Sequence, residues 1–589
     1  MEPPFWWTGM KNTSLQLMVH GENIAGLEVK LSYPGLSLES VTRVLNPNYL
    51  FINLDVSGMT KPGTFDLTFN SEKRTIASYS YELKSRKDSS ANRIGFNSSD
   101  VIYLITPDRF VNGDTKNDEF PGMKEKPNRM DKSGRHGGDI KGITNSLDYL
   151  KNLGYTAVWV NPVLENNMTK TSYHGYSTTD FYKLDPRFGE HDDYLELSNQ
   201  LKKRGMKLIM DMIFNHCGSE HWWMDDMPMD DWINNYPDYK ITNHRRTVNQ
   251  DPHASEIDKS EMTDGWFVPT MPDLNQKNPF LATYLIQNSI WWIEYAGLEG
   301  IRQDTWPYPD KNMMAEWTSR VLEEYPNFNI VGEEWSLNPA IVSYWQKGKL
   351  NADGYHCNLP SLMDFPLQNS VKQAFNNKEG WSQGMVELYE ALSNDFLYAD
   401  ANNLVVFPDN HDMSRFLTQV NEDVDMLKMA VAYFLTTRGI PQFLYGTEVL
   451  MSNPGTEDHG IIRSDFPGGW KGDKINAFTG EGLSGQQKEM QNYVRKIQTW
   501  RKNKAIIHTG KLTHFAPKDG VYVFFRHAEN EAVMVVLNKN RKESKLATER
   551  FKEITKTYSK GVDIISSTVI EDLDNIVVPA RSAMIIEIK

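Results

Sequence analysis

Eight short apolar segments recur along the middle of the chain, and amphipathic helical patterns separate most of them. They lie at residues 101–105, 156–161, 207–212, 300–304, 328–333, 361–365, 404–408 and 441–445. A strand, a helix and a further strand form the βα repeat, and eight strands of this kind predict a (β/α)8 TIM barrel. Such barrels place their active site at the C-terminal ends of the strands, so the polar residues that close these segments are the candidates.

The chain has 589 residues and extends beyond such a barrel on both sides. Between residues 14 and 87, and again from about residue 511, apolar and polar residues alternate between turns, as is typical of β-sandwiches. We therefore predict a multidomain α/β protein. Its parts are an N-terminal β-sandwich at 1–92, the barrel at 93–505 and a C-terminal β-sandwich at 506–589.

Residues 217–280 are too many for an ordinary βα loop, so they predict a subdomain inserted beside the site. This stretch is rich in aromatic residues, which either pack its core or wall the cleft. They are Trp222, Trp223, Trp232, Tyr236, Tyr239 and Trp266.

Composition excludes several classes of protein. Lys and Arg total 63 against 77 Asp and Glu, and the net charge of −14 argues against nucleic acid as a partner. No apolar run is long enough to span a bilayer, and the two distant cysteines form neither a disulfide framework nor a zinc motif. Aromatic residues make up 12% of the chain, and flat rings are surfaces on which sugars stack.

Distinctive polar clusters follow five of the predicted strands. They lie at residues 173–176, 211–216, 302–304, 332–335 and 407–412. Because barrel strands are parallel, the carboxylates Asp304, Glu333 and Asp412 should converge near one axis. Converging carboxylates suit the cleavage of a glycosidic bond, which needs a nucleophile and a proton donor.

These ordered clusters resemble the motif blocks of the α-amylase family, glycoside hydrolase family 13. The resemblance implies that Asp304 is the nucleophile, Glu333 the general acid/base and Asp412 a carboxylate that favours the distorted transition state. It also implies a substrate-binding set of His174, Tyr176, Asp211, His216, Arg302 and His411, with Tyr176 as the stacking platform. Arg302 stands two residues before Asp304, on the same strand face, where it would keep the nucleophile ionised.

Simpler interpretations exist for single residues. An Asp at a strand end is often a helix N-cap, and an isolated His is more often packed than catalytic. Glu334, beside Glu333, is an alternative acid. A barrel that had lost a carboxylate would be a non-catalytic glucan-binding protein, but all three carboxylates are present here.

A second cluster of oxygen side chains follows the first strand and predicts one calcium ion. Its members are Asn112, Asp114, Asn117 and Asp118, to which Gly137 adds a carbonyl and Asp139 a carboxylate. The arrangement resembles the calcium loop of cyclodextrin glucanotransferases; a plain Asx-rich turn is the alternative. A further family calcium site is not expected, although Asn215 is present, because Pro307 and Tyr308 replace the usual Lys-His.

Residues 271–275 resemble the signature of the branch that contains cyclomaltodextrinases, neopullulanases and maltogenic amylases. Asp273 replaces the usual Lys and is similar to the residue in enzymes that act on α-1,6 links. Residues 3–10 and 464–470 look most like relatives from Bacteroidetes starch-utilisation systems. That resemblance implies a periplasmic protein whose leader is absent from this numbering, with the cytoplasm as the alternative.

The predicted function is retaining hydrolysis of α-1,4-glucosidic bonds in cyclodextrins, maltooligosaccharides and pullulan. An α-amylase or an α-glucan transglycosylase with the same three carboxylates is the alternative. A homodimer is possible, because in relatives of this branch a neighbouring subunit's N-terminal module often narrows the cleft.

Overall fold

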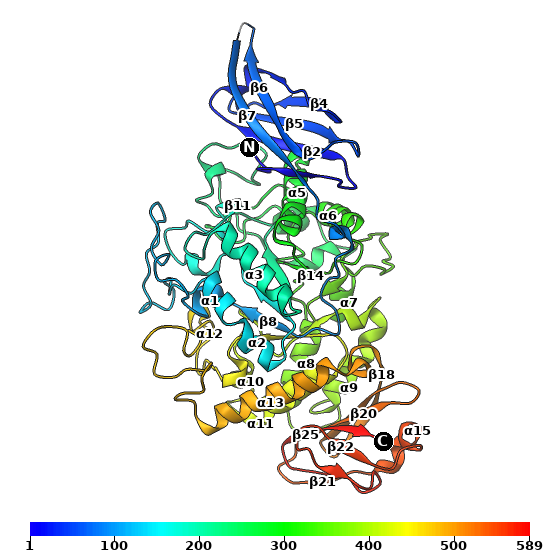
Figure 1. Ribbon diagram of the computed structural model, residues 1–589. Coiled ribbons are helices and arrows are strands. Elements are labelled where there is room, and N and C mark those ends of the chain that lie inside the picture. The colour runs from blue at the N-terminus through cyan, green and yellow to red at the C-terminus, as the bar shows by residue number, and fades with distance from the viewer. Residues whose placement is uncertain (73) are drawn as a thin grey trace.

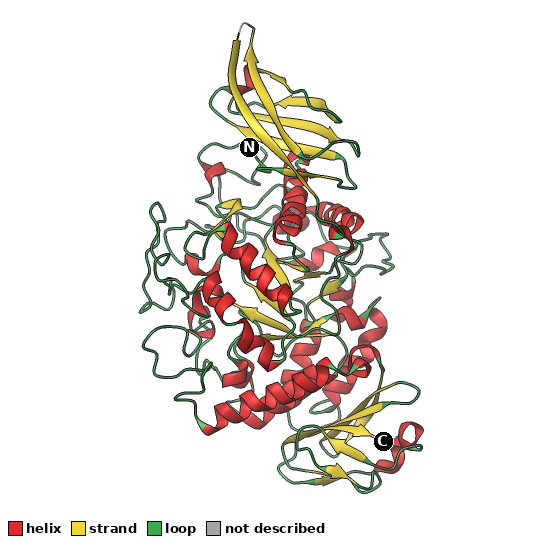
Figure 2. Cartoon of the chain, in the orientation of Figure 1, coloured by secondary structure: helices red, strands yellow, loops and turns green. Residues whose placement is uncertain are grey.

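The computed structural model describes residues 1–72 and 74–589. Three parts follow one another in space, with the N-terminal sheets at one end, the barrel in the middle and the C-terminal sheet at the other end (Figure 1). Helices surround the strands of the central part, whereas strands dominate both ends (Figure 2). None of the helices that the structure describes is long and apolar enough to cross a membrane.

The central sheet contains eight parallel strands in the order β15-β14-β13-β12-β9-β8-β17-β16. In chain order they are β8 Ile102–Ile105, β9 Ala157–Val160, β12 Lys207–Met212, β13 Gly300–Gln303, β14 Ile330–Gly332, β15 Ser361–Leu362, β16 Val405–Val406 and β17 Ile440–Leu444. A parallel bridge between Met363 and Val405 joins the two edges and closes the barrel. The predicted TIM barrel is therefore confirmed.

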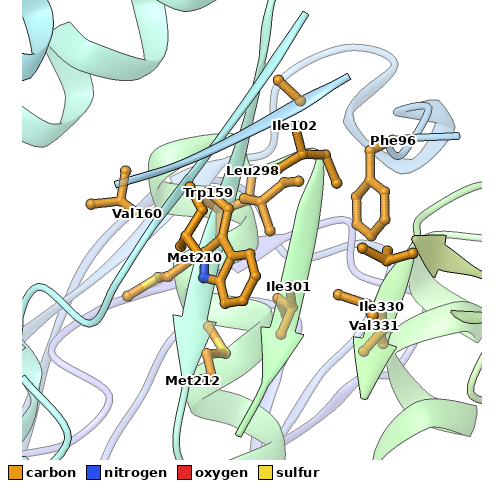
Figure 3. Packing of buried hydrophobic residues seen from close by; sticks show 14 of the residues in the cluster. Phe96, Ile102, Trp159, Val160, Met210, Met212, Leu298, Ile301, Ile330 and Val331 are labelled. Atoms are coloured by element: carbon orange, nitrogen blue, oxygen red, sulfur yellow. The ribbon is translucent and has the colours of Figure 1, made fainter. Parts of the chain in front are cut away.

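Buried side chains from successive strands pack on both faces of the barrel sheet (Figure 3). Trp159 projects into the interior, on the face that also carries Asp211 and Arg302. Met210 and Ile301 stand opposite each other on neighbouring strands and project on the other face, toward the surrounding helices. Phe96 packs against the start of β13, where Gly300 leaves room for its ring. A Cβ at Gly300 would lie 2.4 Å from the Phe96 ring, so only glycine fits there.

Helices begin and end where the sequence supplies caps. Asn278 accepts hydrogen bonds from the first N–H groups of α5, Pro279 occupies its first position, and Gly297 with φ 65° ends it. The helices around the barrel are α1 Ile140–Asn145, α2 Leu147–Leu153, α3 His191–Lys203, α4 Glu256–Thr263, α5 Pro279–Ala296, α6 Lys311–Glu324, α7 Pro339–Ser343, α8 Phe365–Asn376, α9 Val386–Ser393, α10 Phe416–Gln419, α11 Val424–Thr436, α12 His459–Ile462, α13 Gly485–Lys502 and α14 Ala505–Thr509.

Two sheets form the N-terminal part, in agreement with the predicted sandwich. One contains β1 Trp6–Thr8, β7 Arg74–Ser85, β6 Gly63–Ser71 and β3 Glu28–Lys30; the other contains β2 Ser14–His20, β5 Tyr49–Val56 and β4 Leu36–Arg43. Asp226 of the inserted region binds this part, because its carboxylate accepts hydrogen bonds from Asn46 and Asn48 and its carbonyl from Tyr49. The N-terminal part is thus attached directly to the inserted region.

The C-terminal part contains a six-stranded sheet with its own apolar core. Its strands are β18 Lys511–Lys518, β19 Val521–His527, β20 Ala532–Asn538, β25 Ser582–Ile588, β22 Gly561–Asp563 and β23 Val569–Ile570, beside the pair β21 Ser544–Lys545 and β24 Val577–Val578 and the helix α15 Lys552–Thr555. The domain limits at 92/93 and 505/506 remain a proposal.

The inserted region has little regular structure beyond α4, and a further short pair of strands, β10 Leu164–Glu165 and β11 Asp180–Leu184, lies before it. Trp223 and Trp232 are fully buried and meet edge to face, with ring centroids 5.4 Å apart. Tyr236 and Tyr239 are instead exposed at the surface. The aromatic residues of this region therefore divide between its core and its surface.

Candidate active site

One guanidinium joins the ends of three neighbouring strands. Arg302 Nη1 lies 2.6 Å from Asp304 Oδ1 and 2.9 Å from Asp211 Oδ1. Its Nη2 lies 2.8 Å from Glu333 Oε2, an ion-pair distance without hydrogen-bond alignment. Arg302 and Asp211 are fully buried, and a buried charge of this kind needs its partners.

Strand register explains this convergence. Asp211 of β12 stands opposite Arg302 of β13, and Arg302 stands opposite Val331 of β14. Asp304 follows Arg302 by two residues and Glu333 follows Val331 by two, so both carboxylates leave their strands at the same level. The spacing in the sequence therefore predicted the contact between Arg302 and Asp304.

Glu333 is a carboxyl group that is poised to hold a proton. Burial raises its pKa to about 8, and the nearby carboxylates of Asp304 and Asp412 add to the shift against the opposing charge of Arg302. Its Oε2 accepts a hydrogen bond from the Thr305 N–H at 3.0 Å, which orients the side chain. A proton on this group near neutral pH is what a general acid requires.

Asp412, which is partly buried, has the opposite environment. Burial would raise its pKa, but the charge and hydrogen bond of His411 and the charge of Arg463 outweigh burial and hold the pKa well below its usual range. Arg463 Nη2 lies 2.5 Å from Asp412 Oδ1, and Arg463 Nε donates to the His411 carbonyl at 2.8 Å. The sequence analysis missed Arg463, which no motif marks and which follows α12, far along the chain from Asp412.

Stacked rings line one wall beside Asp412. The rings of Tyr176 and His411 are nearly parallel, with centroids 5.5 Å apart, and the ring of His174 also stacks with Tyr176, at 5.9 Å. The Tyr176 hydroxyl donates to Asp211 Oδ2 at 2.8 Å, which fixes the ring in its place. Burial lowers the pKa of His174 to about 3 and that of His411 to about 4, so both are neutral near pH 7.

The cavity between these groups has a volume of about 540 Å³. It is lined by His174, Tyr176, His216, Arg246, Phe267, Met271, Asp304, Thr305, Pro307, Tyr308, Glu333, Trp335, Asp412, His459 and Arg463. The predicted residues Asp211, Arg302 and His411 are not among the lining residues and hold the others from behind. Arg246, Phe267, Trp335 and His459 were missed, although Trp335 stands in the cluster at 332–335.

The structure corrects the expectation that the aromatic residues of the inserted region wall the cleft, and it distinguishes Glu333 from Glu334. None of the six aromatic residues singled out between 217 and 280 lines the cavity; Phe267, next to Trp266, does so instead. Glu334 is buried and accepts a hydrogen bond from Trp345 Nε1 at 2.9 Å, so Glu333 is the carboxyl that faces the cavity.

Asp273 is buried beside the cavity but does not line it. Its Oδ2 accepts a hydrogen bond from Asn234 at 2.8 Å, and burial raises its pKa well above the usual range. Any influence of Asp273 on bond preference must therefore act through the packing of the inserted region rather than through contact in this cavity.

The predicted calcium loop has two kinds of oxygen. Asp139 is the N-cap of α1, since its Oδ1 accepts from the Gly142 N–H and its Oδ2 from the N–H groups of Gly113 and Asp114. In contrast, Asn112 Oδ1 and Asn117 Oδ1 are buried and have no hydrogen-bond partner among the described residues.

Asn112, Asp118 and Gly137 meet in this loop. Asn112 Nδ2 donates to Asp118 Oδ1 at 2.8 Å, and a Cβ at Gly137 would lie 2.7 Å from the same oxygen. Within residues 1–72 and 74–589, no three His, Cys, Asp or Glu side chains are arranged to hold a metal ion, so amide and carbonyl oxygens would have to supply most ligands.

Family models match nearly the whole chain. The alpha-amylase catalytic domain matches residues 104–522, the cyclomaltodextrinase N-terminal domain residues 1–87 and the cyclomaltodextrinase C-terminal domain residues 512–587. The chain therefore belongs to the α-amylase family of glycoside hydrolases.

Particular relatives indicate the branch. The chain is 29% identical to a cyclomaltodextrinase of Thermoanaerobacter pseudethanolicus, over 75% of this chain and 70% of the relative, and 29% identical to neopullulanase 2 of Thermoactinomyces vulgaris, over 74% and 69%. It is also 29% identical to a beta/alpha-amylase of Paenibacillus polymyxa, over 75% of this chain, and spans 33% of that longer protein. The solved α-amylase of Geobacillus thermoleovorans, complexed with acarbose, superposes with a TM-score of 0.67 at 27% identity, over 84% of this chain and 98% of that one.

These matches confirm the predicted family, its cyclomaltodextrinase and neopullulanase branch, and the prediction of an α-glucan hydrolase. The resemblance to relatives from Bacteroidetes stays a prediction.

Proposed function

We propose that this protein hydrolyses α-1,4-glucosidic bonds of cyclodextrins, maltooligosaccharides and pullulan, with retention of the α configuration. The observation that carries the proposal is the pair Asp304 and Glu333 at one guanidinium, where Asp304 accepts a hydrogen bond from Arg302 and burial raises the pKa of Glu333 to about 8. Two carboxyl groups that share Arg302 are held at a short separation, and retaining enzymes need about 5–5.5 Å.

In the first step the Asp304 carboxylate attacks the anomeric carbon and forms an ester bond. The glycosidic C–O bond breaks, and Glu333 gives its proton to the departing oxygen. In the second step Glu333, now a carboxylate, takes a proton from water while the water oxygen attacks the same carbon. The ester bond breaks, Asp304 is a carboxylate again, and Glu333 is again protonated.

The remaining residues bind and distort the sugar that is attacked. Tyr176 offers the face of its ring, and His216 donates a hydrogen bond to a hydroxyl group. His411, which was predicted to do the same, acts from behind the cavity through Tyr176 and Asp412. Asp412, kept ionised by Arg463, binds two sugar hydroxyls and favours the oxocarbenium-like transition state. Asp211 and Arg302 act behind the cavity by orienting Tyr176 and Asp304.

Product analysis tests the proposal against its alternatives. β-Cyclodextrin and short maltooligosaccharides should have higher specificity constants than soluble starch, because long connections surround the mouth of the barrel. Pullulan should be cut mainly to panose, and nuclear magnetic resonance should detect the α anomer first. Better turnover of starch with untouched pullulan would indicate an α-amylase, longer products from oligosaccharides a transglycosylase, and maltotriose from pullulan a debranching enzyme.

We also propose that the loop at 112–139 holds one calcium ion through Asn112, Asp114, Asn117, Asp118, the carbonyl of Gly137 and Asp139. The unpartnered buried oxygens of Asn112 and Asn117 support this, because such oxygens are costly unless a cation or water satisfies them. The ion would supply positive charge to the loop and tie it to the start of α1.

A periplasmic location and a homodimer are further proposals that rest on the branch resemblance. Cell fractionation tests the first, and sedimentation equilibrium of the purified protein tests the second. If the protein is a monomer at all concentrations, no second subunit contributes to the walls of the cavity.

A further inference from the structure

Besides Asp304 and Glu333, the residues that line the cavity include two groups of side chains. The first group surrounds Asp412 and includes Tyr176 and Arg463. The second group contains Phe267 and Tyr308, whose ring centroids are 5.3 Å apart, together with Arg246. The Tyr308 hydroxyl lies 3.1 Å from His244 Nδ1, which holds this ring against the inserted region.

Arg246 is the one basic residue of the second group. It begins a 3-10 turn of the inserted region, at residues 246–249, and its side chain is 28% exposed. Among the described residues, its guanidinium donates no hydrogen bond to a protein acceptor. Five N–H donors are thus available beside a cavity that would receive a neutral, hydroxyl-rich sugar.

Glu334 explains why Arg246 is held there. Arg246 Nε lies 3.8 Å from Glu334 Oε1, and that oxygen is buried without a hydrogen-bond partner in the described part of the chain. A buried carboxylate needs a counter-charge, and Arg246 is the cation within ion-pair distance. Arg246 and Glu333 both line the cavity, so the guanidinium that Glu334 holds faces the same space as the proton donor.

The side of the cavity on which Arg246 lies follows from the chemistry. Glu333 must deliver its proton to the oxygen of the leaving group, so the departing sugar lies on the side of Glu333. The Asp412 group holds the sugar ring that is attacked. Arg246 and Tyr308 therefore flank the path of the departing sugar.

We propose that Arg246 binds hydroxyl groups of the departing glucosyl unit, and that Glu334 positions it. Arg246 is then a specificity-determining residue that favours substrates whose leaving group is a sugar. This inference rests on the proposed hydrolytic function and assigns a role to the side of the site that none of the sequence motifs describes.

The test compares two substrates that share the glucosyl units held before the scissile bond. Maltotriose has a sugar leaving group, whereas α-maltosyl fluoride releases fluoride and places no sugar beside Arg246. In Arg246→Ala, kcat/KM for maltotriose should fall about 10- to 100-fold, the range for lost hydrogen bonds to a charged group. Release of fluoride should change less than about twofold.

Matched variants keep the test decisive. Arg245→Ala removes the same charge from the neighbouring exposed residue, which does not line the cavity, and should leave both substrates unaffected. Arg246→Lys keeps a counter-charge for Glu334 but loses the planar fork, and should give a smaller loss with maltotriose. Glu334→Gln should lower maltotriose turnover in the same direction, and its effect should not add to that of Arg246→Ala.

Equal losses with both substrates, or no loss with maltotriose in either Arg246 variant, would overturn the inference. Additive effects of Glu334→Gln and Arg246→Ala would overturn the positioning role of Glu334. If the unaltered protein releases no fluoride from α-maltosyl fluoride, the proposed hydrolytic function fails instead, and the two outcomes are thus distinguished.

Discussion

The strand ends around Arg302 and the loop at 112–139 both contain several Asp and Asn residues, but these residues have different partners. At the strand ends, Asp211 and Asp304 share a buried guanidinium. In the loop, Asp139 accepts only backbone N–H groups and Asp118 accepts from an Asn amide. A shared side-chain cation favours the charged form of a carboxylate, which suits a nucleophile, whereas carboxylates bound to backbone donors mainly hold a turn in place.

The largest expected effect is a loss of turnover when the carboxyl groups at the strand ends are replaced. Asp304→Asn and Glu333→Gln should each lower kcat by roughly 10³-fold or more, because each removes a bond-forming or proton-transferring group with little change in volume. Steady-state kinetics with maltotriose measures the loss, and circular dichroism checks that both variants keep the fold. Near-normal turnover in either variant would refute the assigned roles.

A smaller loss is expected when the counter-charge is removed instead of the carboxylate. Arg463→Ala should lower kcat/KM roughly 10- to 100-fold, because Asp412 loses its closest cation and His411 loses a hydrogen bond to its carbonyl. Arg463→Lys should recover part of the activity. Equal activity in all three proteins would mean that Asp412 does not need Arg463.

The pH dependence tests the proton on Glu333. Because the acid form is active and its pKa is raised to about 8, kcat/KM should fall about tenfold per pH unit above that value. A group whose pKa is raised by folding contributes stability that is lost as the pH rises through the folded pKa. Because the ordinary pKa of the group is 4.5, this loss runs from about pH 5 to pH 8. The melting temperature should therefore fall more over that range in the unaltered protein than in Glu333→Gln, and equal falls would contradict the shift.

The smallest expected effect is a change in the stability of the protein when the loop at 112–139 loses its metal ion. A chelator should lower the melting temperature by a few degrees, because an ion bound only by the folded protein stabilises it. Asn112→Ala and Asn117→Ala should abolish this response. Asp139→Ala should lower stability by about 1 kcal/mol even with chelator present, because it removes an N-cap.

A melting temperature that does not respond to chelator, in protein shown to be free of metal, would favour the Asx-rich turn. The loop would then share only its Asp and Asn residues with the strand ends, and its carboxylates would bind neither a metal ion nor a substrate.

The positions of the candidate catalytic residues were predictable because parallel strands carry a fixed period of two. Arg302 and Asp304 are two residues apart, so their side chains leave the same face of β13 whatever the rest of the chain does. The eight strands were found for a different reason, because each is an apolar run, buried on both faces, between helical patterns. Strand ends were less certain; the predicted segment at 404–408 contains a strand of two residues, Val405–Val406.

The N-terminal strands were harder to find, because several of them face solvent along much of their length. Buried and exposed residues do not alternate regularly along β4, and the sequence analysis did not single out this strand. Its place was determined by its pairing with β5 through seven residues and a bulge.

The sequence by itself determined the eight strands, the carboxylates at their ends and the arginine beside the nucleophile, since these depend on local periodicity and on parallel register. Only the tertiary structure decided that Arg463 pairs with Asp412, that Phe267 rather than Trp266 faces the cavity, and that Arg246 meets Glu334. Those contacts join irregular loops, in which side-chain direction follows no period and is set by the packing of distant segments.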